Sequence, residues 1–443
     1  MNRVIAKFGG STTNDVEKLN TACSTISSFV EGGAKVVTVV SALRGVTDTL
    51  KETIDKINYE NFDECFSQCE KKLRKIHGHS RFHASDLSDL ERQFHNFVRS
   101  GKKMWVEDNI LVKGEELFSK HFACRLNDRG IKTELISFDS PEFPLIVHGY
   151  FGNARVDLDR TKAMCDRVLS RFDRYSCVCV PGYGGIDIDS GRVKTLRRGG
   201  SDAAATALSY GFSASALWII TDVNGIKRAF TKKLTNAPTI PLLCVEELRD
   251  AGVYGAKVPN EAAIRPLMLH CPQETFVAKY NEVDGEKTRI VDRKETDRTR
   301  VVELAAQREI INYEFNGTNL HAKISRLESE LHDKLIDFLS LGGGNYTRKL
   351  MIPADQEPYV DRCVTNYRNM VDVTKSTASI VGIVGKGMEQ TPGIIARMGS
   401  ALAKKGINIY YQFDVSPISC GVIVDRQQAE YAVELLYNEF KLF

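Results

Sequence analysis

The sequence predicts an α/β protein: an open, mostly parallel sheet sandwiched by helices, followed by smaller ferredoxin-like βαββαβ modules. Over residues 1–290, short apolar runs rich in β-branched residues alternate with helix-like segments. This alternation is typical of buried parallel strands joined by crossover helices. Beyond about residue 300 the character changes, and residues 378–440 follow a strand–helix–strand–strand–helix order. That change of pattern predicts a second kind of domain.

The first domain is predicted to contain five buried strands. They are the apolar runs at 4–6, 36–40, 133–136, 177–180 and 217–221. Several of them lead directly into glycine or polar residues, and open α/β sheets place their ligands at that edge. The site is therefore expected where these strands end.

The rest of the chain is divided by composition. Residues 50–112 are charged and predict a helical excursion, and the charge-dense stretch 283–300 predicts a linker. We expect a catalytic domain over 1–290, a degenerate module over 301–375 and a clearer module over 376–443. The last module is predicted to contain strands at 378–384, 407–411 and 419–424 and helices at 394–405 and 429–440.

Two glycine-rich segments together describe a phosphate site. Lys7 and the pair Gly9–Gly10 follow the first strand, and 198–202 (R-G-G-S-D) opens an alanine-rich helix. Glycine pairs let the backbone approach a polyphosphate, whose charge the N–H groups of a helix start complement. Either pair alone is equally consistent with a steric need at a turn, and neither is a Walker loop or G-x-G-x-x-G. Such a site suits phosphoryl transfer, which needs positioning and charge stabilisation.

Six segments in order resemble the motifs of aspartate kinases, in the amino acid kinase family. They are K-F-G-G-S at 7–11, S-A-L-R-G-V-T at 41–47, G-E-E-L-F-S at 114–119, T-L-R-R-G-G-S-D at 195–202, T-D-V-N-G at 221–225 and G-A-K-V at 255–258. The C-terminal modules resemble ACT regulatory domains. The resemblance implies the amino acid kinase fold and covers nearly the whole chain.

The resemblance also implies roles for individual residues. Lys7 and Asp202 are the expected catalytic residues. The expected aspartate-binding residues are Ser41, Thr47, Glu115, Arg198 and Ser201. The expected ATP-binding residues are Lys7, Gly9, Gly10, Ser11, Gly199, Gly200, Thr221, Asp222, Lys227, Lys232 and Lys257. Arg198 suits a bidentate clamp on a carboxylate, and Glu115 offers the countercharge for an ammonium group.

The nucleotide side departs from the family pattern. After T-D-V-N-G the family usually has a tyrosine and then an acidic residue, whereas residues 226–232 read I-K-R-A-F-T-K. Arg197 also replaces a glycine. These changes leave the nucleotide preference open. The sequence shows no multi-carboxylate cage, so we expect no dedicated metal site and Mg²⁺ carried in by ATP.

The expected activity is ATP-dependent phosphorylation of the side-chain carboxylate of L-aspartate to 4-phospho-L-aspartate. This reaction is the first step toward lysine, threonine, methionine or diaminopimelate. Two alternatives stay open: a related small-acid kinase of the same fold, and a catalytically weak amino-acid-sensing ACT protein. The ACT resemblance implies a homodimer joined through the C-terminal modules, with lysine or threonine as possible effectors.

Composition limits the partners and the cellular compartment that we expect. A net charge of +3 is close to balance, so we expect no nucleic-acid or membrane-surface partner. No apolar run approaches the length of a membrane span, and no signal peptide is expected. Eleven scattered cysteines fit reduced thiols in a cytoplasm. Cys65 and Cys69 precede several histidines, but no complete set of zinc ligands is evident.

Overall fold

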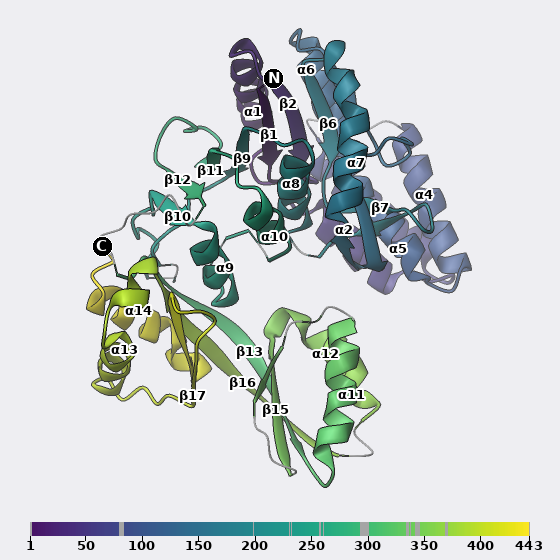
Figure 1. Cartoon of the computed structure of the whole chain (residues 1–443). Coiled ribbons are helices and arrows are strands. Elements are labelled where there is room, and N and C mark those ends of the chain that lie inside the picture. Colours follow the sequence, from purple (N-terminus) through teal and green to yellow (C-terminus); the bar gives the residue numbers. More distant parts are fainter. Residues whose placement is uncertain are drawn as a thin grey trace. The chain divides into compact units, whose positions relative to one another are not determined.

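The computed structural model describes residues 2–78, 84–197, 199–229, 231, 233–256, 258–259, 261–292, 301–333, 336, 338–341, 346–367 and 371–442. These residues belong to two compact units. The first comprises 1–226, 239–246 and 259–296, and the second comprises 227–238, 247–258 and 297–443. Figure 1 shows the elements of each.

The first unit is built on an eight-stranded sheet in the order β10-β12-β11-β9-β1-β2-β6-β3. Its strands are β1 (Arg3–Phe8), β2 (Lys35–Val40), β3 (Thr133–Leu135), β6 (Cys177–Pro181), β9 (Ala216–Thr221), β10 (Leu242–Cys244), β11 (Glu274–Lys279) and β12 (Lys287–Val291). Every neighbouring pair is parallel except β11 and β12. The predicted open, mostly parallel sheet is confirmed.

Helices cover both faces of this sheet, which explains why its central strands are apolar on both sides. They are α1 (Val16–Glu31), α6 (Lys113–Asp128), α7 (Leu158–Val168), α8 (Gly200–Gly211) and α10 (Glu261–Leu269). Helix α1 packs with α6, and α8 packs with α7 and α10. On β1, Val4 and Phe8 face the core under α1 and α6, together with Phe122 of α6.

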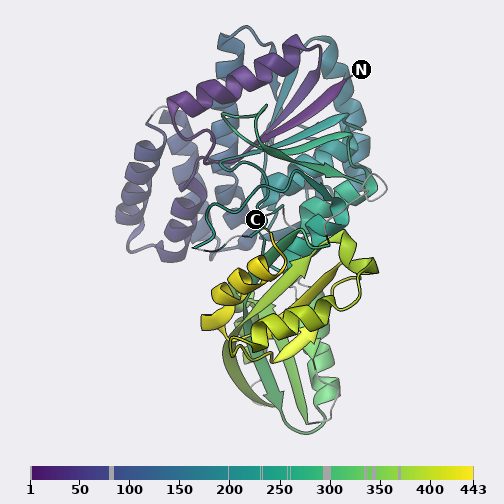
Figure 2. The ribbon, with the colours of Figure 1, turned by 90° about the vertical axis from the view of Figure 1, so that its left-hand side faces the viewer.

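The predicted helical excursion consists of α2 (Val46–Lys56), α3 (Phe62–Ile76), α4 (Ala84–Arg99) and α5 (Met104–Leu111). Figure 2 shows α3 and α4 as a blue-violet pair beside the sheet. Their apolar stripes meet, with Phe66 of α3 in edge contact with Phe94 of α4.

A second sheet of order β5-β4-β7-β8 contains β4 (Ile146–Tyr150), β5 (Asn153–Val156), β7 (Gly184–Asp187) and β8 (Arg192–Thr195).

The predicted linker over 283–300 is wrong in part, because strand β12 lies inside it. Thr288 and Ile290 point into the core and are fully buried. Lys287 and Arg289 alternate with them on the other side of the strand. The outward-facing charges made this stretch look like a polar linker, although every second side chain is buried.

The second unit contains one six-stranded sheet of order β14-β15-β13-β16-β18-β17. Its strands are β13 (Leu304–Asn316), β14 (Leu339–Leu341), β15 (Thr347–Pro353), β16 (Asp372–Val384), β17 (Tyr411–Phe413) and β18 (Ser419–Val424). Its helices include α11 (Leu320–Asp333), α12 (Glu357–Thr365), α13 (Ile394–Ala403) and α14 (Ala429–Glu439). The elements form two copies of strand–helix–strand–strand–helix. Strands β13 and β16 pair antiparallel along their whole length and join both copies in one sheet.

The strand predicted at 407–411 begins only at Tyr411. Gly406 has a φ of 71°, and the Ile407 N–H donates to the Leu402 carbonyl at 3.1 Å. These residues therefore close the end of α13 instead of extending a strand. Ile407 is apolar because it is buried in the core of the module.

A segment from the middle of the chain completes the second unit. Helix α9 (Val245–Val253) belongs to it from residue 247 onward, and Tyr254 follows directly. The Tyr254 ring is fully buried over β16 and β18. A Cβ at Gly382 or Gly421 would lie 2.1 Å or 2.4 Å from ring atoms, so only glycine fits beneath it.

Buried polar contacts hold the same segments. Glu247 is fully buried and accepts the Lys386 N–H at 2.8 Å. Arg228 and Glu303 form a buried ion pair at 2.6 Å. A buried charge is costly without a partner, so the ion pair and the hydrogen bond both stabilise the packing of segments 227–238 and 247–258 in the second unit.

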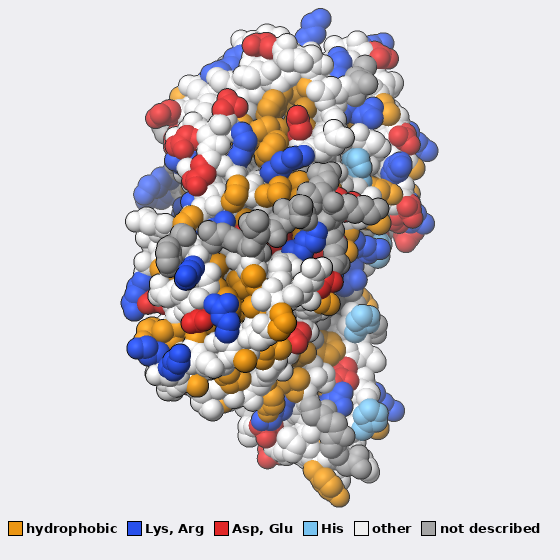
Figure 3. Space-filling view, turned by 60° about the vertical axis from the view of Figure 1, so that its left-hand side comes forward, with side chains coloured by type: hydrophobic (Ala, Val, Ile, Leu, Met, Phe, Trp, Pro, Cys, Tyr) orange, Lys and Arg blue, Asp and Glu red, His pale blue; other side chains and the backbone are white. Residues whose placement is uncertain are grey.

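The surface shows no single-sign field in the view of Figure 3, where basic and acidic side chains are interspersed. Within the part of the chain that the structure describes, no helix combines the length and the apolar character needed to cross a membrane.

Tyr254 offers a test of how firmly this segment is held. Tyr254→Ala is expected to lower the free energy of unfolding of the second unit by about 3–5 kcal/mol, because it empties a buried ring site. Tyr254→Phe keeps the ring and loses only a hydroxyl 3.3 Å from Ser419 Oγ, so it should cost about 1 kcal/mol or less. Denaturant unfolding measures both. Equal losses for the two variants would contradict the packing role.

Candidate active site

The candidate site lies where the central strands of the first unit end. The carboxyl ends of β1, β2, β6 and β9 share one edge of the sheet because these strands are parallel. Hydrogen bonds connect the segments that follow. The Ser41 N–H donates to the Phe8 carbonyl at 3.1 Å, and the Gly182 N–H donates to the Val40 carbonyl at 2.9 Å. The Gly9 N–H also donates to the Ile220 carbonyl of β9 at 3.4 Å, so four chain segments are held against one another at this edge.

The two residues predicted to be catalytic are in direct contact. Lys7 Nζ lies 2.6 Å from Asp202 Oδ1, and the two side chains are 12% and 20% exposed. Lys7 is in β1, opposite Val39 of β2 and Ile219 of β9. Asp202 is in the first turn of α8, where the helix dipole favours a negative charge. The pair places a cation at the helix start.

The first glycine loop approaches a neighbouring backbone very closely. A Cβ at Gly10 would lie 2.1 Å from the Ala42 carbonyl oxygen, so no other residue fits. The Gly9 carbonyl accepts the N–H and the hydroxyl of Thr12, at 2.9 Å and 2.7 Å. Ser11 lies between them and is partly exposed. The loop is therefore rigid and reachable from solvent.

The second glycine loop is equally constrained. Gly199 caps α8 with a φ of 82°, a conformation that favours glycine. A Cβ at Gly200 would lie 2.7 Å from Leu196 Cβ, and one at Gly182 would lie 2.8 Å from Ser201 Oγ. The start of α8 is thus pressed onto the end of β6. Arg198 lies outside the described residues.

Glu115 is the most unusual charged group of the site. It is 3% exposed and accepts the Ala42 N–H, but its Oε2 atom has no hydrogen-bond partner. Burial raises the pKa of Glu115 to about 8. Ser41, which directly precedes Ala42, and Thr47, in the first turn of α2, are partly exposed. A buried carboxylate with one oxygen that accepts no hydrogen bond is suited to bind a cationic group.

The predicted nucleotide side is only partly described. Thr221 ends β9 and is partly exposed, and its hydroxyl donates to Asp222 Oδ1 at 3.2 Å. Lys227 belongs to the second unit. Lys232 and Lys257 lie outside the described residues. Their predicted role in binding ATP stays a prediction.

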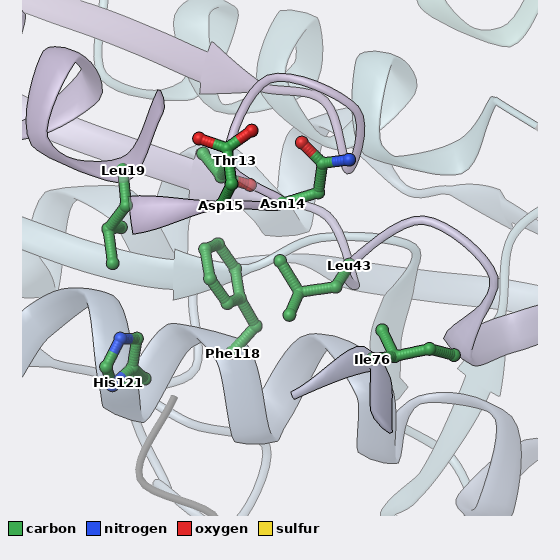
Figure 4. A pocket seen from close by; sticks show the side chains of 8 residues that line it. All are labelled: Thr13, Asn14, Asp15, Leu19, Leu43, Ile76, Phe118 and His121. Carbon is green, nitrogen blue, oxygen red and sulfur yellow. The ribbon is translucent and has the colours of Figure 1, made fainter. Parts of the chain in front are cut away.

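A small pocket lies behind the first glycine loop, between it and helix α6 (Figure 4). It is lined by Thr13, Asn14, Asp15, Leu19, Leu43, Ile76, Phe118 and His121. Its interior has about the size of a water molecule, and most of its lining is apolar. It is too small for an amino acid, and none of the predicted site residues lines it.

Sequence reasoning missed Asp108 of α5. This residue is 1% exposed, and its carboxylate accepts three hydrogen bonds, from the Gly152 N–H and from the N–H and hydroxyl of Thr195. Burial raises the pKa of Asp108 to about 6. A signal was present, because Asp108 follows Trp105 by three residues and precedes Val112 by four. That spacing places a carboxylate on the apolar face of a helix.

Among the described residues, no three histidine, cysteine, aspartate or glutamate side chains come together as metal ligands. Cys69 and His77 are both buried. Burial, aided by nearby His121, lowers the pKa of His77 to about 4. His77 is therefore neutral near pH 7.

Known proteins resemble the whole chain. The model of the amino acid kinase family matches residues 2–278, and that of the ACT domain matches residues 381–440. An aspartate kinase of Pseudomonas fluorescens is 23% identical, with 99% of this chain and 97% of the relative covered. An aspartokinase of a Bacillus species is also 23% identical, with 100% and 98% covered.

Solved structures agree in fold. The crystal structure of E. coli aspartokinase III in complex with aspartate and ADP matches with a TM-score of 0.81, covering 99% of both chains at 19% identity. The aspartate kinase of Clostridium acetobutylicum matches with a TM-score of 0.70 at 22% identity, covering 99% of this chain and 100% of that one. Because the family model spans more than half of the sequence, the chain belongs to the amino acid kinase family, with an ACT domain in its C-terminal part.

Proposed function

We propose that this protein is an ATP-dependent aspartate kinase that converts L-aspartate to 4-phospho-L-aspartate, the first step toward lysine, threonine, methionine or diaminopimelate. The observation that carries the proposal is the buried Glu115 carboxylate, whose Oε2 atom has no hydrogen-bond partner. An amino acid substrate supplies an ammonium group that would satisfy this atom. The names of the relatives of similar length support aspartate as the acceptor.

In this proposal the acceptor has its ammonium group at Glu115 and its carboxylates at hydroxyl and guanidinium groups. Ser41 directly precedes Ala42, whose N–H Glu115 accepts, and Thr47 lies in the first turn of α2; both are partly exposed and are the proposed hydroxyl partners of a carboxylate. Arg198 and Ser201 follow in the second glycine loop. Arg198 would bind one carboxylate through two parallel hydrogen bonds.

The transfer itself needs little covalent help from the protein. A side-chain carboxylate oxygen of aspartate attacks the γ-phosphorus, the bond from that phosphorus to the bridging oxygen breaks, and ADP leaves with the electron pair. Lys7 stabilises the charge on the transferred group, and Asp202 holds the Lys7 ammonium in position at 2.6 Å. The phosphates are proposed to lie at the two glycine loops, next to Lys7 and the start of α8. Mg²⁺ bound to ATP would neutralise phosphate charge.

The setting of the proposed activity is a reducing one. All eleven cysteines are thiols outside any disulfide, and several of them are buried. We place the protein in the cytoplasm, where thiols stay reduced.

A hydroxamate assay tests the function, because hydroxylamine traps acyl phosphates. We expect turnover with aspartate, ATP and Mg²⁺, and none in excess chelator. Lys7→Ala should lower kcat by about a hundredfold or more and change the aspartate KM little, since Lys7 acts mainly in the transition state. Lys51→Ala, on the exposed side of α2, is the control. Turnover with another acid but not with aspartate would favour a related kinase, and no turnover with any acid would favour a sensor.

The ionisation of Glu115 predicts a pH dependence. Its pKa of about 8 means that the free enzyme holds mostly the protonated form at pH 6.5, and only the ionised form attracts an ammonium group. The aspartate KM should therefore fall about tenfold between pH 6.5 and pH 8. Glu115→Gln should show a high KM at both pH values.

The neighbouring Glu116 provides the matched control. Glu116→Gln removes a carboxylate that pairs with Lys113 at 2.8 Å, so it should keep the pH dependence of the wild type. A wild-type KM that does not change with pH would contradict the role of Glu115. An equal change in all three proteins would assign the effect to aspartate itself.

We also propose a homodimer joined through the second unit. This unit exposes several large apolar side chains, namely Tyr346, Tyr359, Ile395, Tyr410 and Tyr431. Such surface is typical of interfaces. Lysine or threonine is the proposed effector, held by backbone N–H groups of the loop 385–393 other than those of Gly385, Lys386, Met388 and Thr391, which donate within the second unit. E. coli aspartokinase III has been solved with lysine bound.

Two measurements test assembly and regulation. Analytical ultracentrifugation is expected to give a dimer at micromolar concentration, and a monomer would contradict the proposal. Titration of lysine and threonine into the kinase assay is expected to lower the rate with one of them. An unchanged rate at millimolar concentrations of both would leave the second unit with assembly alone.

A further inference from the structure

We propose that Asp108 is a positioning residue for the acceptor side of the active site. It holds the end of β8 against helix α5, which leads into helix α6 with Glu115. Through β8 it also holds the second glycine loop. The inference rests on the proposed function. It adds a residue that lies outside every motif of the family resemblance.

Asp108 uses both of its carboxylate oxygens on two chain segments, the end of β8 and the turn between β4 and β5. Oδ2 accepts the N–H of Thr195 and the N–H of Gly152, each at 2.9 Å, and Oδ1 accepts the Thr195 hydroxyl at 2.8 Å. Asp108 is 1% exposed, and Thr195 is fully buried. Water cannot readily replace a partner there, so removing the carboxylate leaves buried donors unsatisfied.

Thr195 is the last residue of β8 and leads directly into the glycine loop. The next residue, Leu196, donates its N–H to the Tyr183 carbonyl at 2.7 Å. Leu196 also packs onto Gly200, where a Cβ would lie 2.7 Å from Leu196 Cβ. By fixing Thr195, Asp108 therefore also helps to fix the position of Leu196 and of the first turn of α8, which contains Ser201.

Helix α5 is itself firmly fixed, so it can act as the anchor. Val106 and Ile110 are fully buried, on either side of Asp108 in the chain. The Arg192 guanidinium at the start of β8 lies 4.3 Å from the centre of the Trp105 ring. Helix α6 begins two residues after α5 ends and carries Glu115 in its first turn.

Asp108 thus joins the two sides of the acceptor site. One side is the helix with Glu115, which would bind the ammonium group. The other is the loop with Arg198 and Ser201, which would bind carboxylates. A loss of Asp108 should let the second side move relative to the first, and aspartate binding should suffer more than ATP binding.

Three variants separate positioning from simple stability. Asp108→Ala removes all three hydrogen bonds. Asp108→Asn can keep them, because the amide oxygen accepts both N–H groups and the amide nitrogen donates to the Thr195 hydroxyl. Thr161→Ala removes another fully buried hydroxyl, which the Ile146 N–H reaches at 3.0 Å, and serves as the structural control.

The measurements are the KM for aspartate, the KM for ATP, kcat and the thermal unfolding temperature. Asp108→Ala is expected to raise the aspartate KM about tenfold or more and the ATP KM by less than about threefold. Asp108→Asn should restore the aspartate KM to within about threefold of the wild type. Thr161→Ala should lower the unfolding temperature and leave both KM values unchanged.

If Asp108→Ala does not fold, Thr195→Val replaces it, because valine keeps the N–H bond and loses only the hydroxyl. It should raise the aspartate KM about threefold and leave the ATP KM unchanged. Equal increases in both KM values, or a lower unfolding temperature with unchanged kinetics, would overturn the inference and leave Asp108 a structural residue. A wild type inactive toward aspartate would instead overturn the proposed function.

Discussion

The Lys7–Asp202 ion pair is the interaction on which the first unit depends most visibly. A lysine inside a central parallel strand is costly to bury unless a countercharge meets it. Asp202 can meet it only because α8 begins at the edge where β1 ends, and a helix start tolerates a negative charge. The strand order sets this geometry, since β1 lies between β2 and β9. The order of the strands therefore determines where these two charges can meet.

Close backbone contacts make the same edge rigid. Gly10, Gly182 and Gly200 each lie where a Cβ would strike a neighbouring atom below 3.0 Å. A larger residue at any of them would push apart two segments of the site. The glycines therefore set the spacing between the segments of the site.

The sequence was informative where a pattern is local. Apolar runs located the central strands, and the glycine motifs located the loops around Lys7 and Asp202. It was uninformative where a residue's role depends on distant partners. Asp108 looks like an ordinary helical aspartate until Thr195 lies against it, and Tyr254 looks like an ordinary helix-end tyrosine until Gly382 lies under it. Strand β12 was missed for a related reason, because its outward charges hid the alternation of buried Thr288 and Ile290.

The two units are interleaved along the chain. Segments 227–238 and 247–258 lie within the span of the amino acid kinase match, yet both belong to the second unit. The ring of Tyr254, in the second of these segments, packs on Gly382 of β16 and Gly421 of β18. A single cut of the chain therefore cannot separate the two units, and expressing either one alone would require joining segments that are far apart in the sequence.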